Sequence, residues 1–303
     1  MKILIVGGKG FIGSHLFSQL EKQASVTCID NINDPIEKDF INVDLTNINQ
    51  VINFAVNCDN FDVLIFLVGI AYAKGKGKDL TNFKNVNYQT LVNLLSALDN
   101  NNKIPEKIMF TSTISVYGER YDQKLYNENL EPCPFSPYAV TKHKAEQYLL
   151  DGYPNKSWIL RSAPIYSADF LLHINLRTKI SNWFFKVGDG KTRLSLCNIE
   201  NIKTAIEGIL NEKVPADIYN ISDNEPYMYR ELLEWQHATF TVRIPKIIVK
   251  TLYKFGKIFA NIFLQENTVK LLTDNIYPSK KIRAFIELPH TLKDVQPNMK
   301  DAQ

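Results

Sequence analysis

The glycine-rich segment Val6-Gly7-Gly8-Lys9-Gly10-Phe11-Ile12-Gly13 is the strongest indication of the fold. It follows a short apolar run over 2–6 and opens a stretch of helical spacing over 11–20, which places its glycines between a strand and a helix. The first glycine permits a tight turn, the second lets the backbone approach a pyrophosphate, and the third lets the helix pack closely on the strand. The start of that helix would attract phosphate, because its amide groups and dipole favour negative charge. The residues that this pattern predicts to contact a dinucleotide are Gly7, Gly10, Phe11, Ile12 and Gly13.

Short apolar runs alternate with stretches of helical spacing through the first half of the chain. The run over 63–68 is continuously apolar, as is typical of a strand covered on both faces. Such alternation predicts an α/β fold, a Rossmann-type doubly wound parallel sheet with right-handed crossovers. The expected strands are 2–6, 25–29, 42–44, 63–68, 107–112 and 158–161, and the expected helices are 11–20, 87–98 and 138–150.

After residue 161 this alternation weakens, which predicts a smaller and less regular second domain. We expect a dinucleotide-binding domain over 1–165 and a smaller C-terminal substrate-binding domain over 166–303. A strand over 217–222 is expected to return to the main sheet, within a segment of about 195–222 that rejoins the first domain.

Composition places the chain among ordinary globular proteins, with 303 residues, 45% of them hydrophobic and 22% charged. A net charge of +3 is too small for an electrostatic grip on nucleic acid to be the main function. The four cysteines form no CxxC pair, so neither a metal site nor a disulfide scaffold is expected. No signal peptide or spanning segment stands out, and we expect a cytoplasmic protein. The apolar stretch 247–264 is interrupted by three lysines and predicts an amphipathic helix packed on the protein body, with a membrane-surface or partner helix as the alternative.

Asp30 ends the second expected strand, 17 positions after Gly13. A carboxylate there would accept hydrogen bonds from the 2′-hydroxyl of an adenosine ribose and would repel a 2′-phosphate. The sequence therefore favours NAD over NADP, with Asn31 beside the ribose. Asp44 and Leu45, which follow the third expected strand, are weaker candidates for contacts with the adenine.

Tyr138 and Lys142 lie four positions apart and would share one face of a helix. An ammonium beside a phenol lowers the pKa of the phenol, which could then exchange a proton with a substrate alcohol while a nicotinamide carries the hydride. The stretch 110–118 is rich in hydroxyl groups at the end of a strand, and one of them could bind the same substrate oxygen. Lys191 and Arg193 are candidate partners for a substrate diphosphate.

With these residues in this order, the sequence resembles the extended short-chain dehydrogenase/reductase superfamily, in particular the NAD-dependent nucleotide-sugar epimerase/dehydratase group typified by UDP-galactose 4-epimerase. The resemblance is strongest over 1–165. It implies that Thr113, Tyr138 and Lys142 are catalytic and that Asn87 lies beside the cofactor. It also implies a nucleotide-sugar substrate, and by analogy a homodimer formed through the helices expected at 87–98 and 138–150.

Within that group, Ile114 and Ser115 after Thr113 replace the Asp-Glu pair usual in 4,6-dehydratases, which disfavours dehydration. Two reactions at C4 of the sugar stay open, 4-epimerisation and 4-ketoreduction. The resemblance points to a UDP-activated amino or deoxy sugar used in surface polysaccharide biosynthesis. The alternative from another class is a non-catalytic NAD-binding or NAD-sensing protein on the same fold.

Overall fold

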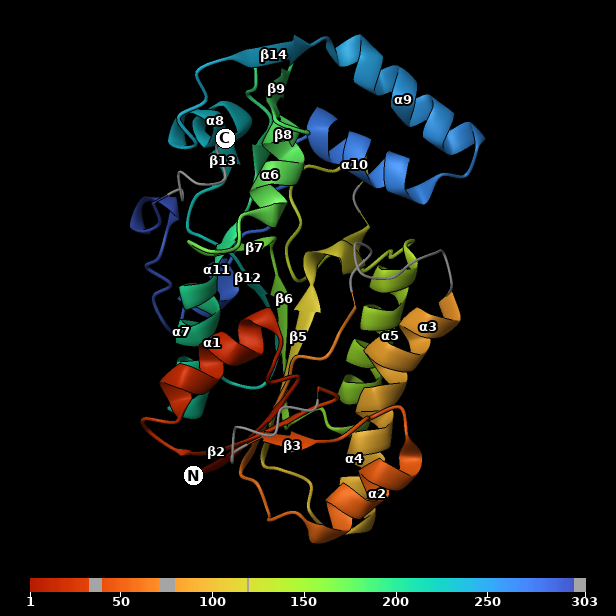
Figure 1. Cartoon of the computed structure of the whole chain (residues 1–303), viewed down its shortest axis with the longest axis vertical. Helices are drawn as coiled ribbons and strands as arrows, with labels where there is room; N and C mark the ends of the chain where they lie inside the picture. The colour runs from red at the N-terminus through yellow and green to blue at the C-terminus, as the bar shows by residue number, and fades with distance from the viewer. Residues whose placement is uncertain (33–39, 71–79, 119, 297–303) are drawn as a thin grey trace. The chain divides into compact units, whose positions relative to one another are not determined.

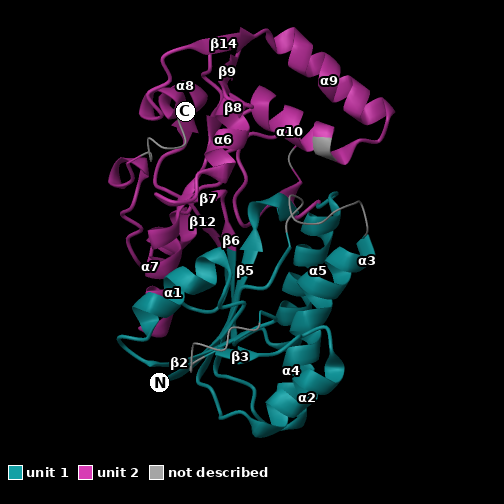
Figure 2. Cartoon of the chain, viewed as in Figure 1, with its two compact units in different colours: residues 1–116, 134–160, 215–218 teal, residues 117–133, 161–214, 219–303 magenta. Residues whose placement is uncertain are grey.

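The computed structural model describes residues 1–32, 40–70, 80–118 and 120–296 (Figure 1). Contacts between residues divide the chain into two compact units (Figure 2). Unit 1 comprises residues 1–116, 134–160 and 215–218, and unit 2 comprises 117–133, 161–214 and 219–303. The segment 117–133 thus belongs to unit 2, although it lies within the range 1–165 that the sequence assigns to one domain. The predicted division into 1–165 and 166–303 stays a prediction.

A seven-stranded sheet has the strand order β12-β6-β5-β4-β1-β2-β3. The strand pairs β1–β2, β1–β4, β2–β3 and β4–β5 are parallel. Hydrogen bonds from Ile159 N to Asp217 O and from Ala163 N to Ile221 O advance by four residues on both strands, so β6 and β12 are parallel as well. The strands are β1 (Lys2–Val6), β2 (Ser25–Asp30), β3 (Phe40–Asn42), β4 (Val63–Phe66), β5 (Lys107–Thr113), β6 (Ser157–Ser162) and β12 (Ile218–Ile221).

Helices cover both faces of the sheet in unit 1, with α1 on one face and α2, α4 and α5 on the other (Figure 1). A hydrophobic core joins the strands to the second group of helices through residues such as Leu4, Leu94 and Leu149. This layering is the doubly wound arrangement that the alternating sequence predicts, and it is confirmed. The helices are α1 (Phe11–Leu20), α2 (Ile48–Asn57), α3 (Leu80–Lys84), the π-helical turn η1 (Asn85–Gln89), α4 (Thr90–Asn100) and α5 (Pro137–Gly152).

Several elements differ from their predicted bounds by one or two residues at an end, among them two strands and a helix. The third strand is Phe40–Asn42 and not 42–44, because the carboxylate of Asp44 accepts from the amide and hydroxyl of Thr46 and turns the chain toward α2. The fourth strand ends at Phe66 and not at residue 68. The expected helix over 87–98 begins within η1 and continues as α4 to Asn100.

Unit 2 contains smaller sheets and helices. The expected single helix over 247–264 is two helices, because Ala260 has a φ of 49° and the side chain of Asn261 caps a new helix by accepting from Leu264 N. The strands are β7 (Ile165–Tyr166), β8 (Lys179–Ile180), β9 (Trp183–Val187), β10 (Arg193–Leu194), β11 (Cys197–Asn198), β13 (Tyr227–Met228) and β14 (Thr241–Ile244). The helices are α6 (Leu172–Thr178), α7 (Ile199–Leu210), α8 (Tyr229–Trp235), α9 (Lys246–Ile258), α10 (Ile262–Leu272) and α11 (Lys280–Arg283), with the short 3₁₀ turn η3 (Leu292–Asp294). A second 3₁₀ turn, η2 (Ile114–Tyr117), follows β5 where the chain passes from unit 1 into unit 2.

None of the helices described here combines the length and the apolar character needed to cross a bilayer. All four cysteines are free thiols, with Cys28 and Cys197 buried and Cys133 exposed. Over the described ranges, no group of three or more His, Cys, Asp or Glu side chains is arranged to hold a metal ion.

Candidate active site

The glycine-rich turn between β1 and α1 is shaped by close backbone contacts. Gly7 has a φ of +86°, and its amide donates to Ile29 O at 2.9 Å. A methyl group on Gly13 would lie 2.3 Å from Gly7 O, so only glycine lets α1 pack this tightly against the turn. At Gly10 the nearest atom to such a methyl group is Gly7 O at 3.2 Å, which leaves that side of the turn open. The turn therefore fits a pyrophosphate at Gly10.

Gly10 begins α1 without a side-chain cap from the described residues, and the first turn of α1, at Phe11 and Ile12, is where the helix would meet an anion. Asp30 lies beside this turn at the end of β2. Its carboxylate accepts from Lys9 N at 2.9 Å and from Asn31 N at 2.8 Å. The structure thus places the acidic residue directly beside the glycine turn, where a ribose would follow a pyrophosphate.

Asp44 and Leu45 have local structural contacts. The Asp44 carboxylate binds Thr46, and Leu45 is buried in the hydrophobic core of unit 1. Any contact of Leu45 with an adenine would therefore come from its backbone. The adenine role of these two residues stays a prediction.

Thr113, Tyr138 and Lys142 are brought together by β5 and α5. Thr113 ends β5, and Ser136 caps α5 so that Tyr138 lies in its first turn. The Thr113 side chain lies within interaction range of the Tyr138 phenol and lowers its pKa. Lys142, one turn after Tyr138, is 3% exposed, and its Nζ lies 3.5 Å from Val68 O and 4.2 Å from the centre of the Phe110 ring. The three predicted catalytic residues therefore form one cluster in unit 1.

Asn87 connects this cluster to the segment after β4. Its Oδ1 accepts from Ile70 N at 2.7 Å, and its Nδ2 donates to Ile70 O at 3.2 Å and to Thr141 Oγ1 at 3.3 Å. Asn87 is fully buried within η1, and π-helical turns of this kind are often found at functional sites. A methyl group on Gly69 would lie 3.5 Å from Lys142 Nζ and 3.6 Å from Asn87 Oδ1, so Gly69 borders both residues.

Glu146 is a site residue that the sequence analysis missed. It is fully buried on α5, one turn after Lys142, and its carboxylate accepts from the Ser112 hydroxyl and contacts His143 Nδ1 at 3.4 Å. Its negative charge raises the pKa of Lys142 and so opposes the effect of burial. The spacing Lys142-x-x-x-Glu146 was visible in the sequence, but its meaning depends on Ser112, which lies far away in the chain.

The direction of the pKa shift at Tyr138 differs from the expectation. Burial raises the pKa of Tyr138, while the Thr113 side chain lowers it. Lys142 is not among the causes, because burial also disfavours the ammonium and lowers the pKa of Lys142 from 10.5 to about 7. The prediction that the lysine lowers the pKa of this phenol is therefore wrong for this structure.

Lys142 should give the stability of the protein a pH dependence. Between pH 7 and 10.5 the unfolded chain binds more protons at this residue than the folded chain does, so stability rises with pH, by at most about 1.4 kcal/mol per pH unit. Below pH 7 the penalty for the buried ammonium is fully present. We expect urea unfolding of Lys142→Met to lack this rise, and Lys144→Met, exposed on the same helix, to keep it. Identical pH slopes for wild type and Lys142→Met would contradict the burial of a titrating lysine.

Lys191 and Arg193, the residues predicted to bind a substrate diphosphate, belong to unit 2 and form ion pairs within it. Lys191 Nζ lies 3.6 Å from the Asp189 carboxylate. Arg193 donates to Asp274 from its backbone amide and from two guanidinium nitrogens, at 2.9, 3.2 and 3.0 Å. Asp274 would therefore compete with a phosphate for this guanidinium, and the substrate role of both cations stays a prediction.

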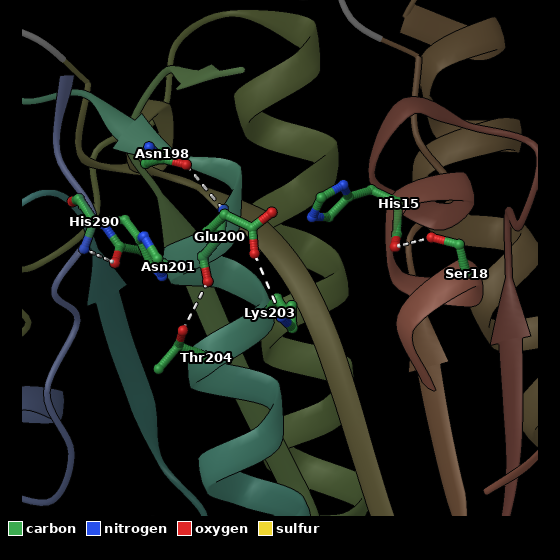
Figure 3. A network of polar contacts seen from close by, with 8 residues as sticks. All are labelled: His15, Ser18, Asn198, Glu200, Asn201, Lys203, Thr204 and His290. Carbon is green, nitrogen blue, oxygen red and sulfur yellow. Dashed lines mark hydrogen bonds and ion pairs between the residues drawn. The ribbon is translucent and has the colours of Figure 1, made fainter. Parts of the chain in front are cut away.

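A second polar network lies within unit 2 around Asn198 and Asp223. The Asp223 carboxylate accepts from Tyr166, Tyr227 and Asn201 side chains and from Asn198 N, at 2.6 to 2.9 Å. Burial raises the pKa of this carboxyl. Figure 3 shows how the side chain of Asn198 caps α7 by accepting a hydrogen bond from Glu200 N. The side chain of Asn201 accepts a hydrogen bond from His290 N. This network holds the start of α7 against residues 290 and 291.

Solved structures with this fold include several sugar-nucleotide epimerases. The UDP-Glc/GlcNAc 4-epimerase from Campylobacter jejuni has a TM-score of 0.77 at 19% identity, with 99% of this chain and 97% of that chain covered. The UDP-glucuronic acid 4-epimerase from Bacillus cereus, solved in complex with NAD, has a TM-score of 0.72 at 22% identity, with coverage of 100% and 96%. At these identities the likeness establishes the shared fold.

Curated proteins that are similar in sequence are also named as sugar-nucleotide epimerases, and they match about half of this chain. An uncharacterized UDP-glucose epimerase of Bacillus subtilis (strain 168) is 32% identical over 162 residues, which are 48% of this chain and 50% of that protein. A probable UDP-arabinose 4-epimerase of Arabidopsis thaliana is 29% identical over 188 residues, 55% of this chain and 44% of that protein. The chain thus spans about half the length of these curated relatives.

A family model described as "NAD dependent epimerase/dehydratase family" matches residues 3–222. That range includes the glycine turn, Asp30, Asn87 and the cluster of Thr113, Tyr138 and Lys142. The description names NAD, the cofactor that Asp30 predicts. The resemblance drawn from the sequence is thereby confirmed, and the chain belongs to the NAD dependent epimerase/dehydratase family.

Proposed function

We propose that this protein is an NAD-dependent epimerase that inverts C4 of a nucleotide-activated sugar. The observation that carries the proposal is the cluster in which Thr113 acts on the pKa of Tyr138 and the buried Lys142 lies one helical turn after that tyrosine. The glycine turn and Asp30 belong to the same unit and fit a dinucleotide. NAD, when bound there, would remove a hydride from C4 and return it to the opposite face of the sugar.

Each residue of the cluster has a defined task in this proposal. Tyr138 Oη takes the proton of the C4 hydroxyl and later gives it back, which makes it the general base and then the general acid. The Thr113 hydroxyl binds the same sugar oxygen and, by lowering the pKa of Tyr138, favours its phenolate. Lys142 holds the nicotinamide ribose, and Asn87 keeps the chain after β4 in place beside it.

UDP is the nucleotide that we propose for the substrate. The relatives named above are described as acting on UDP-glucose and UDP-arabinose, and Lys191 and Arg193 are the cations proposed to meet the diphosphate. An amino or deoxy sugar of a surface polysaccharide remains the proposed sugar class. We also propose a homodimer formed through α4 and α5, which light scattering after size exclusion would test.

The deciding experiment is incubation of the purified protein with a panel of UDP-sugars and UDP-4-keto-6-deoxy sugars, with and without added NADH. A 4-epimerase interconverts C4 isomers without net consumption of cofactor. A 4-ketoreductase instead consumes NADH in proportion to product, and that result would replace the epimerase assignment. NAD binding without turnover of any sugar would favour the non-catalytic alternative.

Asp30→Ala is expected to weaken NAD binding more than NADP binding. The carboxylate would accept from the ribose 2′-hydroxyl of NAD and repel the 2′-phosphate of NADP, so its removal costs only NAD a favourable contact. The expected loss for NAD is about tenfold, the scale of one hydrogen bond to a charged group. Titration of both dinucleotides into the variant measures this, and equal losses would contradict the assignment of Asp30 to the ribose.

A further inference from the structure

Helix α9 in unit 2 has three distinct faces. Val249 and Gly256 are buried, Val249 in a cluster with β9 and α10, and Gly256 against Gln265 of α10. The helix therefore packs on the protein body, as the sequence predicts. The cations Lys246, Lys250, Lys254 and Lys257 recur every three or four residues and form a second face.

The third face of α9 is apolar and exposed. Ile247 and Ile258 are 68% and 73% exposed, and Phe259, just after the helix, is 71% exposed. Ile248, Leu252 and Phe255 lie between these ends on the same face and are exposed as well. Contiguous exposed apolar side chains of this kind mark a surface that another phase or molecule covers.

The charged residues that border this apolar face favour an anionic partner. Residues 235–265 contain five cations, Arg243 and the four lysines of α9, and no acidic residue. Lys250 and Lys254 are exposed, and neither has an acidic partner within the described ranges. A helix with an apolar face bordered by lysines, lying on the surface of a protein, matches the pattern of helices that lie in the plane of an anionic bilayer.

A second copy of the chain fits this face less well. In an antiparallel two-fold contact between two α9 helices, the lysine rows would lie on the same side of the interface and repel each other. An anionic lipid surface instead accepts the isoleucines and phenylalanines between its acyl chains and pairs its phosphates with the lysines. We propose that α9 docks this protein on an anionic membrane surface, with the helix parallel to the bilayer plane.

The test is cosedimentation of the purified full chain with vesicles of phosphatidylcholine alone or mixed equally with phosphatidylglycerol. We expect binding to the mixed vesicles that weakens with added salt. Lys250→Glu/Lys254→Glu should bind at least about 30-fold more weakly, since each lysine near such a surface contributes about fivefold. Ile247→Ser/Ile258→Ser should also lose at least about tenfold, because both side chains would leave the acyl region. The matched control, Lys213→Glu/Lys293→Glu, changes two exposed lysines of unit 2 outside α9 and should bind like wild type.

Three results would overturn the proposal. These are absence of wild-type binding to the mixed vesicles, equal losses in the α9 charge variant and its control, and unchanged binding in the isoleucine variant. A change in molar mass on light scattering in Ile247→Ser/Ile258→Ser, without wild-type vesicle binding, would assign the face to self-association. All of these substitutions are at exposed positions, and thermal unfolding would verify that each variant is folded. None of these readouts depends on sugar turnover.

Discussion

Tyr138→Phe is expected to lower turnover of the sugar at least about 100-fold while leaving cofactor binding nearly unchanged. The substitution removes only the phenolic oxygen, which is the proposed proton acceptor and donor and the partner of Thr113. The ring keeps its place in the first turn of α5, which Ser136 caps. Steady-state rates and NAD titration of the same preparation separate the two effects.

Tyr148→Phe provides the matched control, because Tyr148 lies on the same helix and packs against Tyr88 and Tyr153. It should keep wild-type turnover. Thr113→Val should act in the same direction as Tyr138→Phe, since loss of its hydroxyl raises the pKa of Tyr138 further above its ordinary value. Turnover of Tyr138→Phe near the wild-type rate would remove this residue from the chemistry.

Gly13→Ala is expected to lower the stability of the protein by about 1–3 kcal/mol and to abolish measurable NAD binding, because overpacking forces a backbone shift. The added methyl group would lie 2.3 Å from Gly7 O and 2.7 Å from Gly8 Cα, and both are backbone atoms of the glycine-rich turn between β1 and α1. No side-chain rotation can relieve such contacts. Urea unfolding and NAD titration measure the two losses.

Two other glycines separate packing from cofactor binding. Gly10→Ala meets only Gly7 O at 3.2 Å, so it should fold but bind NAD more weakly, since its methyl group would project toward the pyrophosphate. Gly152→Ala has nothing within 4 Å and should be neutral or slightly stabilising, by about 0.4–1 kcal/mol. If Gly13→Ala had the same free energy of unfolding as the wild type, α1 could move away from the turn without loss of stability, and this prediction would be contradicted.

The parts of the fold that could be read from the sequence are those fixed by local pattern. Helix α1 matches its predicted bounds because Gly10 and the apolar spacing after it define both its start and its face. Strand β3 did not match because it is an edge strand with the exposed Ile41, so burial imposed little pattern on it. The break after α9 was missed because Ala260 adopts a left-handed conformation that alanine rarely takes, which leaves Asn261 as the only local signal.

In the candidate site too, the residues that could be predicted are those fixed by local spacing. Tyr138 and Lys142 were found because their spacing along one helix already places them together. Glu146 has the same spacing, but its role depends on burial against Ser112 and on its charge beside Lys142. The direction of the pKa shift of Tyr138 was predicted wrongly because desolvation depends on how deeply a group is buried, and spacing along a helix says nothing about depth.

The division of the chain into two units has a consequence for how the protein can be cut. The backbone passes between the units five times, at 116/117, 133/134, 160/161, 214/215 and 218/219. Thr113 and Tyr138 lie on opposite sides of the excursion 117–133 into unit 2. A truncation near residue 165 would therefore remove β12, which forms one edge of the sheet. It would also leave the segment 117–133 without most of unit 2, to which that segment belongs. Expression of either half alone should give insoluble chains, because each half would lack segments of its own unit.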